Sequence, residues 1–85
     1  MVFVLDKKYR NYIENIDFSD MSVAPIFSNN TEESFSITVD DNDVLNFEDS
    51  ITYEIVSNGM DNQDTVNDLG IILYTIYDLI IEQIP

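Results

Sequence analysis

The sequence predicts an α+β fold, in which a small three-stranded antiparallel sheet is packed by a long C-terminal helix and preceded by a short N-terminal helix (α-β-β-β-α). Three observations predict it. Apolar and polar residues alternate in the middle of the chain, apolar residues recur every three or four positions near both ends, and turn-forming residues separate these segments. The 85 residues contain no repeat, low-complexity tract or linker, so we expect one domain, residues 1–85.

The first predicted elements are a short helix and an extended segment. Residues 7–16 have helical spacing of their apolar side chains, which are Tyr9, Tyr12, Ile13 and Ile16. Pro25 then interrupts the chain, and because proline cannot donate to a central ladder, residues 22–28 are expected to be extended or an edge strand.

Three strands are predicted in the middle of the chain. Residues 34–40 alternate strictly, with Phe35, Ile37 and Val39 on one face. Turn-forming residues at 40–43 predict a hairpin back into a second strand at residues 44–47. A third strand is expected at residues 51–56, where Ile51, Tyr53 and Ile55 alternate with Thr52, Glu54 and Val56.

A long helix is predicted from Asp61 to about Gln83. Its sheet-facing side is a repeat at three and four residues, formed by Val66, Leu69, Leu73, Ile76 and Ile80. Further apolar residues widen this side beyond one stripe: Ile72, Tyr74, Tyr77, Leu79 and Ile81. Either the sheet and the first helix cover the surplus, or a homodimer forms through it.

The charge balance is extreme. There are 17 acids and 3 cations, which gives a formal net charge of −14. The cations are Lys7, Lys8 and Arg10, and only Asp6 among the acids precedes them. Repulsion among so many unpaired acids lowers stability, and the cations of a partner would relieve it. The alternatives are that the charge serves solubility or adaptation to high salt.

Several function classes are disfavoured by composition. Without His or Cys and with only two Lys, the usual general bases and nucleophiles are scarce, so we expect no enzyme and no cofactor. Direct binding to nucleic acid requires cations that this chain lacks. The longest apolar region, residues 69–81, is too short and too charged to cross a bilayer, and with no export signal we expect a cytoplasmic protein.

Two groups of acids invite comparison with calcium sites. They are Asp40, Asp41 and Asp43, and Asp61, Asp64 and Asp68. Neither has the turn glycine and the terminal glutamate of a calcium loop, so no metal site is expected.

The partner-binding residues are predicted to form two acidic ridges. The first comes from the expected hairpin and the next turn: Asp40, Asp41, Asp43, Glu48 and Asp49. The second is a polar stripe on the last helix: Asp64, Asp68, Thr75, Asp78 and Glu82. Such ridges can imitate a phosphate backbone and attract a basic groove.

In its size, unpaired acidity, lack of Cys and α-β-β-β-α outline, the chain resembles phage-encoded DNA-mimic inhibitors, including small acidic anti-CRISPR proteins and inhibitors of restriction or DNA-repair enzymes. The resemblance covers the whole chain in outline but includes no sequence motif, so no family residue is carried over. It implies a nuclease or other DNA-binding enzyme as the target, blocked sterically in the host cytoplasm. The alternative is an antitoxin-like or assembly subunit that binds through the apolar surplus of the last helix.

Overall fold

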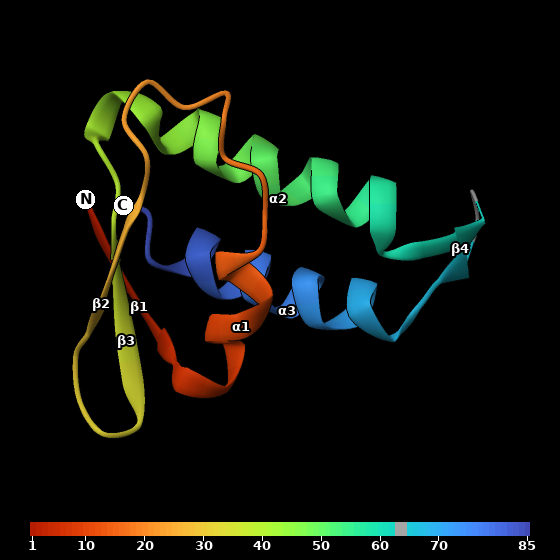
Figure 1. Ribbon diagram of the computed structural model, residues 1–85, viewed down its shortest axis with the longest axis horizontal. Coiled ribbons are helices and arrows are strands. Elements are labelled where there is room, and N and C mark those ends of the chain that lie inside the picture. The colour runs from red at the N-terminus through yellow and green to blue at the C-terminus, as the bar shows by residue number, and fades with distance from the viewer. Residues whose placement is uncertain (63–64) are drawn as a thin grey trace.

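The computed structural model describes residues 1–62 and 65–85 (Figure 1). The elements in chain order are β1 (Val2–Asp6), η1 (Lys7–Tyr9), α1 (Arg10–Glu14), β2 (Ile26–Asn29), β3 (Ser34–Thr38), η2 (Asp41–Asp43), α2 (Val44–Asn58), β4 (Met60–Asn62), β5 (Thr65–Val66) and α3 (Asp68–Glu82). The α+β class, the three-stranded antiparallel sheet and the long C-terminal helix packed on it are confirmed.

The central strand of the sheet is β3. The strand order is β1-β3-β2, and both neighbours run antiparallel to β3. Ile37 of β3 is opposite Phe3 on one side and Phe27 on the other. The strict alternation predicted this strand because one of its faces, with Phe35 and Ile37, is fully buried. The edge strand β2 overlaps the C-terminal part of the segment predicted at residues 22–28.

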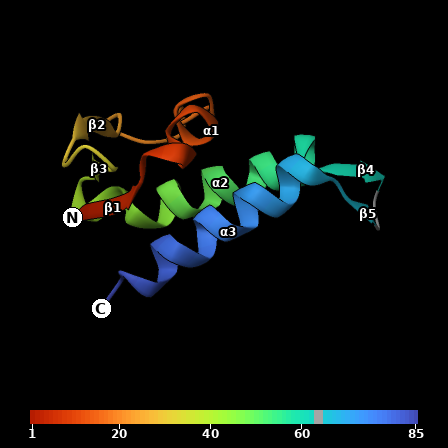
Figure 2. The same cartoon turned by 90° about the horizontal axis from the view of Figure 1, so that it is seen from below.

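The two long helices, α2 and α3, run antiparallel to each other and are joined by the β4–β5 hairpin (Figure 2). On its other side α3 contacts α1 and β1. Leu73, Ile76 and Ile80 of α3 are buried in this sandwich. The wide apolar arc of the last helix is therefore largely covered within the chain, and α2 covers part of it.

The core extends from the sheet to the helices through three aromatic rings. Phe47 of α2 stacks on Phe3 of β1, with ring centroids 5.5 Å apart, and on Phe18, with centroids 5.3 Å apart. Phe18 belongs to the loop between α1 and β2. One α2 side chain thus binds the sheet on one side and this loop on the other.

The strands predicted at residues 44–47 and 51–56 are wrong, because both segments belong to α2. Phe47, Ile51 and Ile55 are spaced four residues apart and are all buried, which is a helical stripe. Tyr53, which the strand pattern placed inside, is 73% exposed. The apolar residues of this segment fit both the period of a strand and the period of a helix. Packing against β1 and α3 buries the helical stripe, and this burial outweighs the strand propensity of Ile, Thr and Val.

Other predicted boundaries are corrected as well. Residues 40–43 lead into α2 through η2 and do not form a hairpin turn. The helix start expected at Asp61 lies in β4, and α3 begins at Asp68, where the Asn67 side chain accepts a hydrogen bond from the Gly70 N–H at 2.9 Å. The first strand, β1, was not predicted. Its four consecutive apolar residues, Val2 to Leu5, show no alternation, and only the pairing with β3 identifies them as a strand.

Candidate functional site

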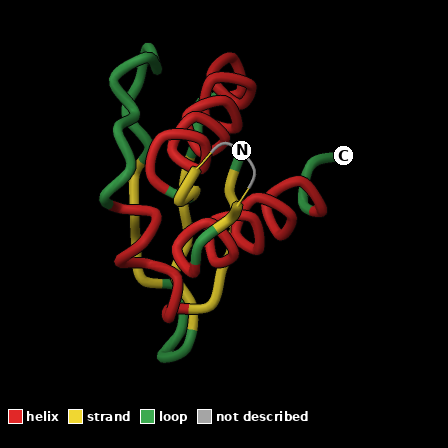
Figure 3. Tube along the Cα trace, turned by 90° about the vertical axis from the view of Figure 1, so that its right-hand side faces the viewer, coloured by secondary structure: helices red, strands yellow, loops and turns green. Residues whose placement is uncertain are grey.

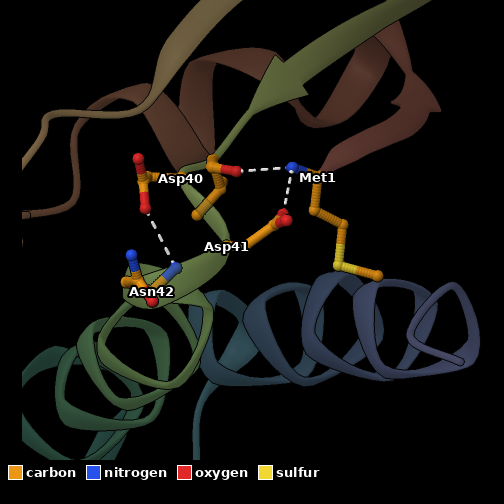
Figure 4. A network of polar contacts seen from close by, with 5 residues as sticks. Met1, Asp40, Asp41 and Asn42 are labelled. Atoms are coloured by element: carbon orange, nitrogen blue, oxygen red, sulfur yellow. Dashed lines mark hydrogen bonds and ion pairs between the residues drawn. The ribbon is translucent and has the colours of Figure 1, made fainter.

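Two of the predicted binding acids, Asp40 and Asp41, lie at the start of η2 and are exposed (Figure 4). Asp40 accepts a hydrogen bond from the Asn42 N–H at 2.9 Å. The Asp41 carboxylate is 2.8 Å from the amino group of Met1, which also donates to the Val39 carbonyl at 2.7 Å. The hydrogen bond and the charge of this amino group lower the pKa of Asp41. Asp41 is therefore partly neutralised within the chain.

Asp43, also predicted to bind a partner, is instead a buried structural carboxylate. It is only 2% exposed. Its two oxygens accept hydrogen bonds from the Ser22 N–H at 3.1 Å and the Val23 N–H at 2.9 Å. These backbone donors lower the pKa of Asp43. The sequence placed Asp43 on an exposed ridge, whereas the structure places it in the interior, where it binds the backbone of the loop.

The sequence placed Glu48 and Asp49 in one ridge with Asp40 and Asp41, and Asp64 and Asp68 in a second ridge with Thr75, Asp78 and Glu82. On α3, Asp68, Thr75, Asp78 and Glu82 are all exposed. Glu48 is half-buried and Asp49 is exposed on α2, whereas Asp68 is exposed at the first position of α3. The β4–β5 end of the helix pair, where Asp68 lies, is the end opposite the start of α2 (Figure 1). Asp64 lies outside the described residues.

The structure instead brings Asp49 together with acids that were not predicted. A groove of 560 Å³ runs between the loop after α1 and one face of α2. We call it the acidic groove, and its lining residues are Asp17, Asp20, Asn46, Asp49, Ser50, Tyr53, Glu54, Ser57 and Asn58. Four of them are carboxylates and none is a cation.

The α2 wall of the acidic groove is one helix face. Its residues, from Asn46 to Asn58, follow one another at alternating spacings of three and one and extend about 18 Å along the axis at 1.5 Å per residue. Tyr53 presents an exposed aromatic ring on this wall. Asn58 donates through Nδ2 to the Glu54 carboxylate at 3.0 Å, so the last turn of the wall is held by a side-chain pair.

The other wall is the loop between α1 and β2, which passes beside α2 (Figure 3). Three contacts hold it there. Phe18 stacks on Phe47, Met21 is buried in the core, and Asp43 binds the backbone of Ser22 and Val23. Asp43 therefore acts as a positioning residue: it keeps the loop with Asp17 and Asp20 against the helix.

Hydrogen bonds from Ser19 stabilise the ionised form of Asp17. Its carboxylate accepts a hydrogen bond from the Ser19 N–H at 2.9 Å, and the Ser19 hydroxyl and this N–H lower the pKa of Asp17. In residues 1–62 and 65–85 the ion pairs are Met1 with Asp41 and Arg10 with Glu14, both outside the acidic groove. The groove thus presents carboxylates without counterions.

The acids of the groove are spread along it. Over the described part of the chain, no three acids come together as a group that could hold a metal ion. A row of separate carboxylates, with amides, hydroxyls and one exposed tyrosine ring between them, suits several cationic side chains of a protein, because guanidinium groups pair with carboxylates and stack on aromatic rings.

The α2 wall of the acidic groove can be recognised in the sequence once the segment is taken as a helix. Once residues 44–58 form a helix, Asn46, Asp49, Tyr53 and Ser57 appear as a polar face away from the buried stripe. The prediction of strands at residues 44–47 and 51–56 placed Asn46 and Tyr53 on different faces. Asp17 and Asp20 carry no such signal, since their position depends on long-range contacts of the loop with Asp43 and Phe47.

A comparison of the chain with protein-family models, curated proteins and solved structures found no match. None of the described helices combines the length and the apolar character that crossing a membrane needs.

Proposed function

We propose that this protein is an acidic inhibitor that binds the basic nucleic-acid-binding groove of a nuclease or other DNA-binding protein. The acidic groove and the exposed acids around it take the place of nucleic-acid phosphates. The observation that carries the proposal is the set of carboxylates in this groove, Asp17, Asp20, Asp49 and Glu54, which face no cation among the described residues.

The electrostatics support an encounter with a strongly basic surface. A net charge of −14 on 85 residues creates a long-range field that steers cationic partners and repels nucleic acid itself. At the surface, the acidic groove concentrates part of this charge where a protruding Arg or Lys can reach it. Affinity for such a partner should fall as salt rises.

The first experiment identifies the partner and the type of contact. The immobilised protein captures partners from a bacterial lysate, and the bound proteins are then eluted by salt or by competing DNA. Release by both agents is the expected result, because mimicry requires a shared, charge-dependent binding surface. A partner that resists both agents would contradict the proposal.

A charge-neutral variant of the groove gives the sharper test. The triple change Asp20→Asn, Asp49→Asn and Glu54→Gln should weaken binding to the captured protein by about tenfold or more, because interfacial charge pairs each contribute about 1.5 kcal/mol or more. Binding is measured by calorimetry. Asp17 is left intact because its turn with Ser19 shapes the loop.

The matched control removes the same charge from exposed positions outside the groove and outside both predicted ridges: Glu32→Gln, Glu33→Gln and Asp61→Asn. It should weaken binding by less than about threefold, the effect of diffuse charge alone. Equal losses in both triple variants would show that the groove is not the binding site.

A second candidate function rests on the apolar surface that remains on the last helix. Ile71, Tyr74 and Ile81 of α3 are 58%, 45% and 38% exposed and occupy one side of the helix. This surface favours the antitoxin-like or assembly role, with a hydrophobic partner. A complex of that kind keeps its affinity in high salt and loses it in the variant Ile71→Ser with Tyr74→Ser.

A further inference from the structure

The outer edge of β1 is closed by the side chain of Gln83. The sheet order β1-β3-β2 leaves β1 with a neighbour on one side only. On the other side, the Val4 N–H donates to Gln83 Oε1 at 2.8 Å, and Gln83 Nε2 donates to the Val4 carbonyl at 2.9 Å. A side-chain amide at residue 83 thus makes the pair of hydrogen bonds that a neighbouring strand would make.

Gln83 is held in this position by its own helix end. Its Nε2 also donates to the Leu79 carbonyl at 3.1 Å, and its backbone N–H donates to the Ile80 carbonyl at 3.0 Å. The side chain is nevertheless exposed and lies on the surface. It covers the edge without being locked into the core, so removing it should leave the fold intact.

The edge that Gln83 covers is well suited to pair with another strand. In β1 the residues whose backbone groups point outward are Val2, Val4 and Asp6, since Phe3 and Leu5 pair toward β3. Val2 and Val4 are also 57% and 42% exposed. An uncovered apolar edge of this kind is a template for self-association.

The charges at the two ends of β1 indicate that the strand best suited to pair with this edge is β1 of a second copy of the chain. Lys7 and Lys8 follow the C-terminal end, and Asp41 with Asp40 lies beside Met1 at the N-terminal end. An antiparallel pair of β1 strands centred on Val4 places Val2 opposite Asp6 and Met1 opposite Lys7. Each copy then presents its lysines to the aspartates of the other, twice by symmetry.

We propose that Gln83 is an edge guard that keeps β1 from pairing with β1 of a second copy. The guard satisfies both backbone groups of Val4 at the centre of the pairing register. Without it, the free edge and the complementary ends favour a symmetric antiparallel dimer, in spite of the net charge of each chain. The inference is independent of the proposed function, because it concerns the edge of β1 and not the acidic groove.

The variant Gln83→Ala tests the proposal. Light scattering during size exclusion should show a single chain for the wild-type protein from micromolar to millimolar concentration, and a dimer for the variant at the upper end. Hydrogen exchange adds a local readout: at low concentration the Val4 amide of the variant should exchange faster by on the order of tenfold, and at high concentration it should regain protection.

Two further variants make the result specific. Glu82→Ala removes an exposed neighbour that has no described contact with β1, and should leave both readouts as in the wild-type protein. Adding Val4→Pro to Gln83→Ala should restore the single chain. Proline removes the N–H that points away from β3 and leaves the hydrogen bonds between β1 and β3 in place.

The proposal is overturned if Gln83→Ala remains a single chain at all concentrations, or if its dimer persists in the Val4→Pro double variant. A wild-type dimer with a mass that Gln83→Ala does not change would also overturn it. Circular dichroism checks that every variant is folded before the masses are compared.

Discussion

Asp43 shows how one residue can look like a binding acid and serve the fold. In the sequence it stands beside Asp40 and Asp41, and all three acids look equivalent. In the structure Asp43 is buried and binds two backbone N–H groups of the loop, whereas Asp40 and Asp41 are exposed. The distinction depends on residues about twenty positions away, so no local pattern could reveal it. Its effect on function passes through Asp17 and Asp20, which it positions.

Replacing Asp43 with Asn should lower the melting temperature by several degrees, because Asn offers one oxygen acceptor for two N–H donors. Asp40→Asn is the matched control and should have little effect, since Asn can also cap η2. Thermal unfolding measures both. If Asp43→Asn is as stable as the control, the loop is held without the carboxylate.

The stability difference between the wild-type protein and Asp43→Asn should also depend on pH. The folded-state pKa of Asp43 lies below its unfolded value of about 3.9, so its stabilisation is fully present above that value and is lost as pH falls through the folded-state pKa. The difference in melting temperature between wild type and Asp43→Asn should therefore be constant above about pH 5 and shrink in more acidic solution. A difference that grows on acidification would contradict this assignment.

At the scale of elements, the junction of α2 and α3 depends on the two glycines of the chain. Gly59 and Gly70 face each other across the β4–β5 connection, and neither has a positive φ. A Cβ added at Gly70 would lie 2.6 Å from Val66 Cγ1 and still closer to the Gly59 carbonyl oxygen. The glycines are therefore required for close approach of the backbones, and they set where α3 starts against α2.

Gly70→Ala should destabilise the protein by about 2 kcal/mol. Alanine normally stabilises a helix interior relative to glycine by about 1 kcal/mol. The expected change in stability therefore has the opposite sign from the one that helix propensity alone predicts. Denaturant unfolding measures the change. Thr75→Ala, on the exposed side of the same helix, should stay within about 0.5 kcal/mol of wild type. A stabilised Gly70→Ala would show that the two backbones can separate at little cost.

At the scale of the whole molecule, charge opposes the fold. The net charge is −14, and the described residues contain two ion pairs, one of them with the terminal amino group. Like charges on a small domain repel each other and raise the free energy of the compact state. The core that opposes this repulsion is the sandwich of β1, β3, α2 and α3 around Phe3 and Phe47.

Salt should therefore stabilise the isolated protein. Raising sodium chloride from low to physiological ionic strength should increase the melting temperature by about 4 to 8 °C, which corresponds to about 1 kcal/mol in a domain of this size. Replacing sodium by choline at equal ionic strength should give the same rise, because screening does not depend on the cation. A fall in the melting temperature would mean that attractive charge pairs dominate the folded state.

The sequence by itself determined the α+β class, the central strand with Phe35 and Ile37, the edge position of β2 and the C-terminal helix up to its last turn. The central strand and the C-terminal helix each have a single period of apolar residues, which local sequence displays directly, and the edge position of β2 follows from Pro25. The tertiary structure alone decided that Val44–Asn58 is a helix, that Val2–Asp6 pairs with β3, and that Asp17 and Asp20 face Asp49. In each case residues distant in sequence provide the burial or the hydrogen bonds that select one of several locally acceptable conformations.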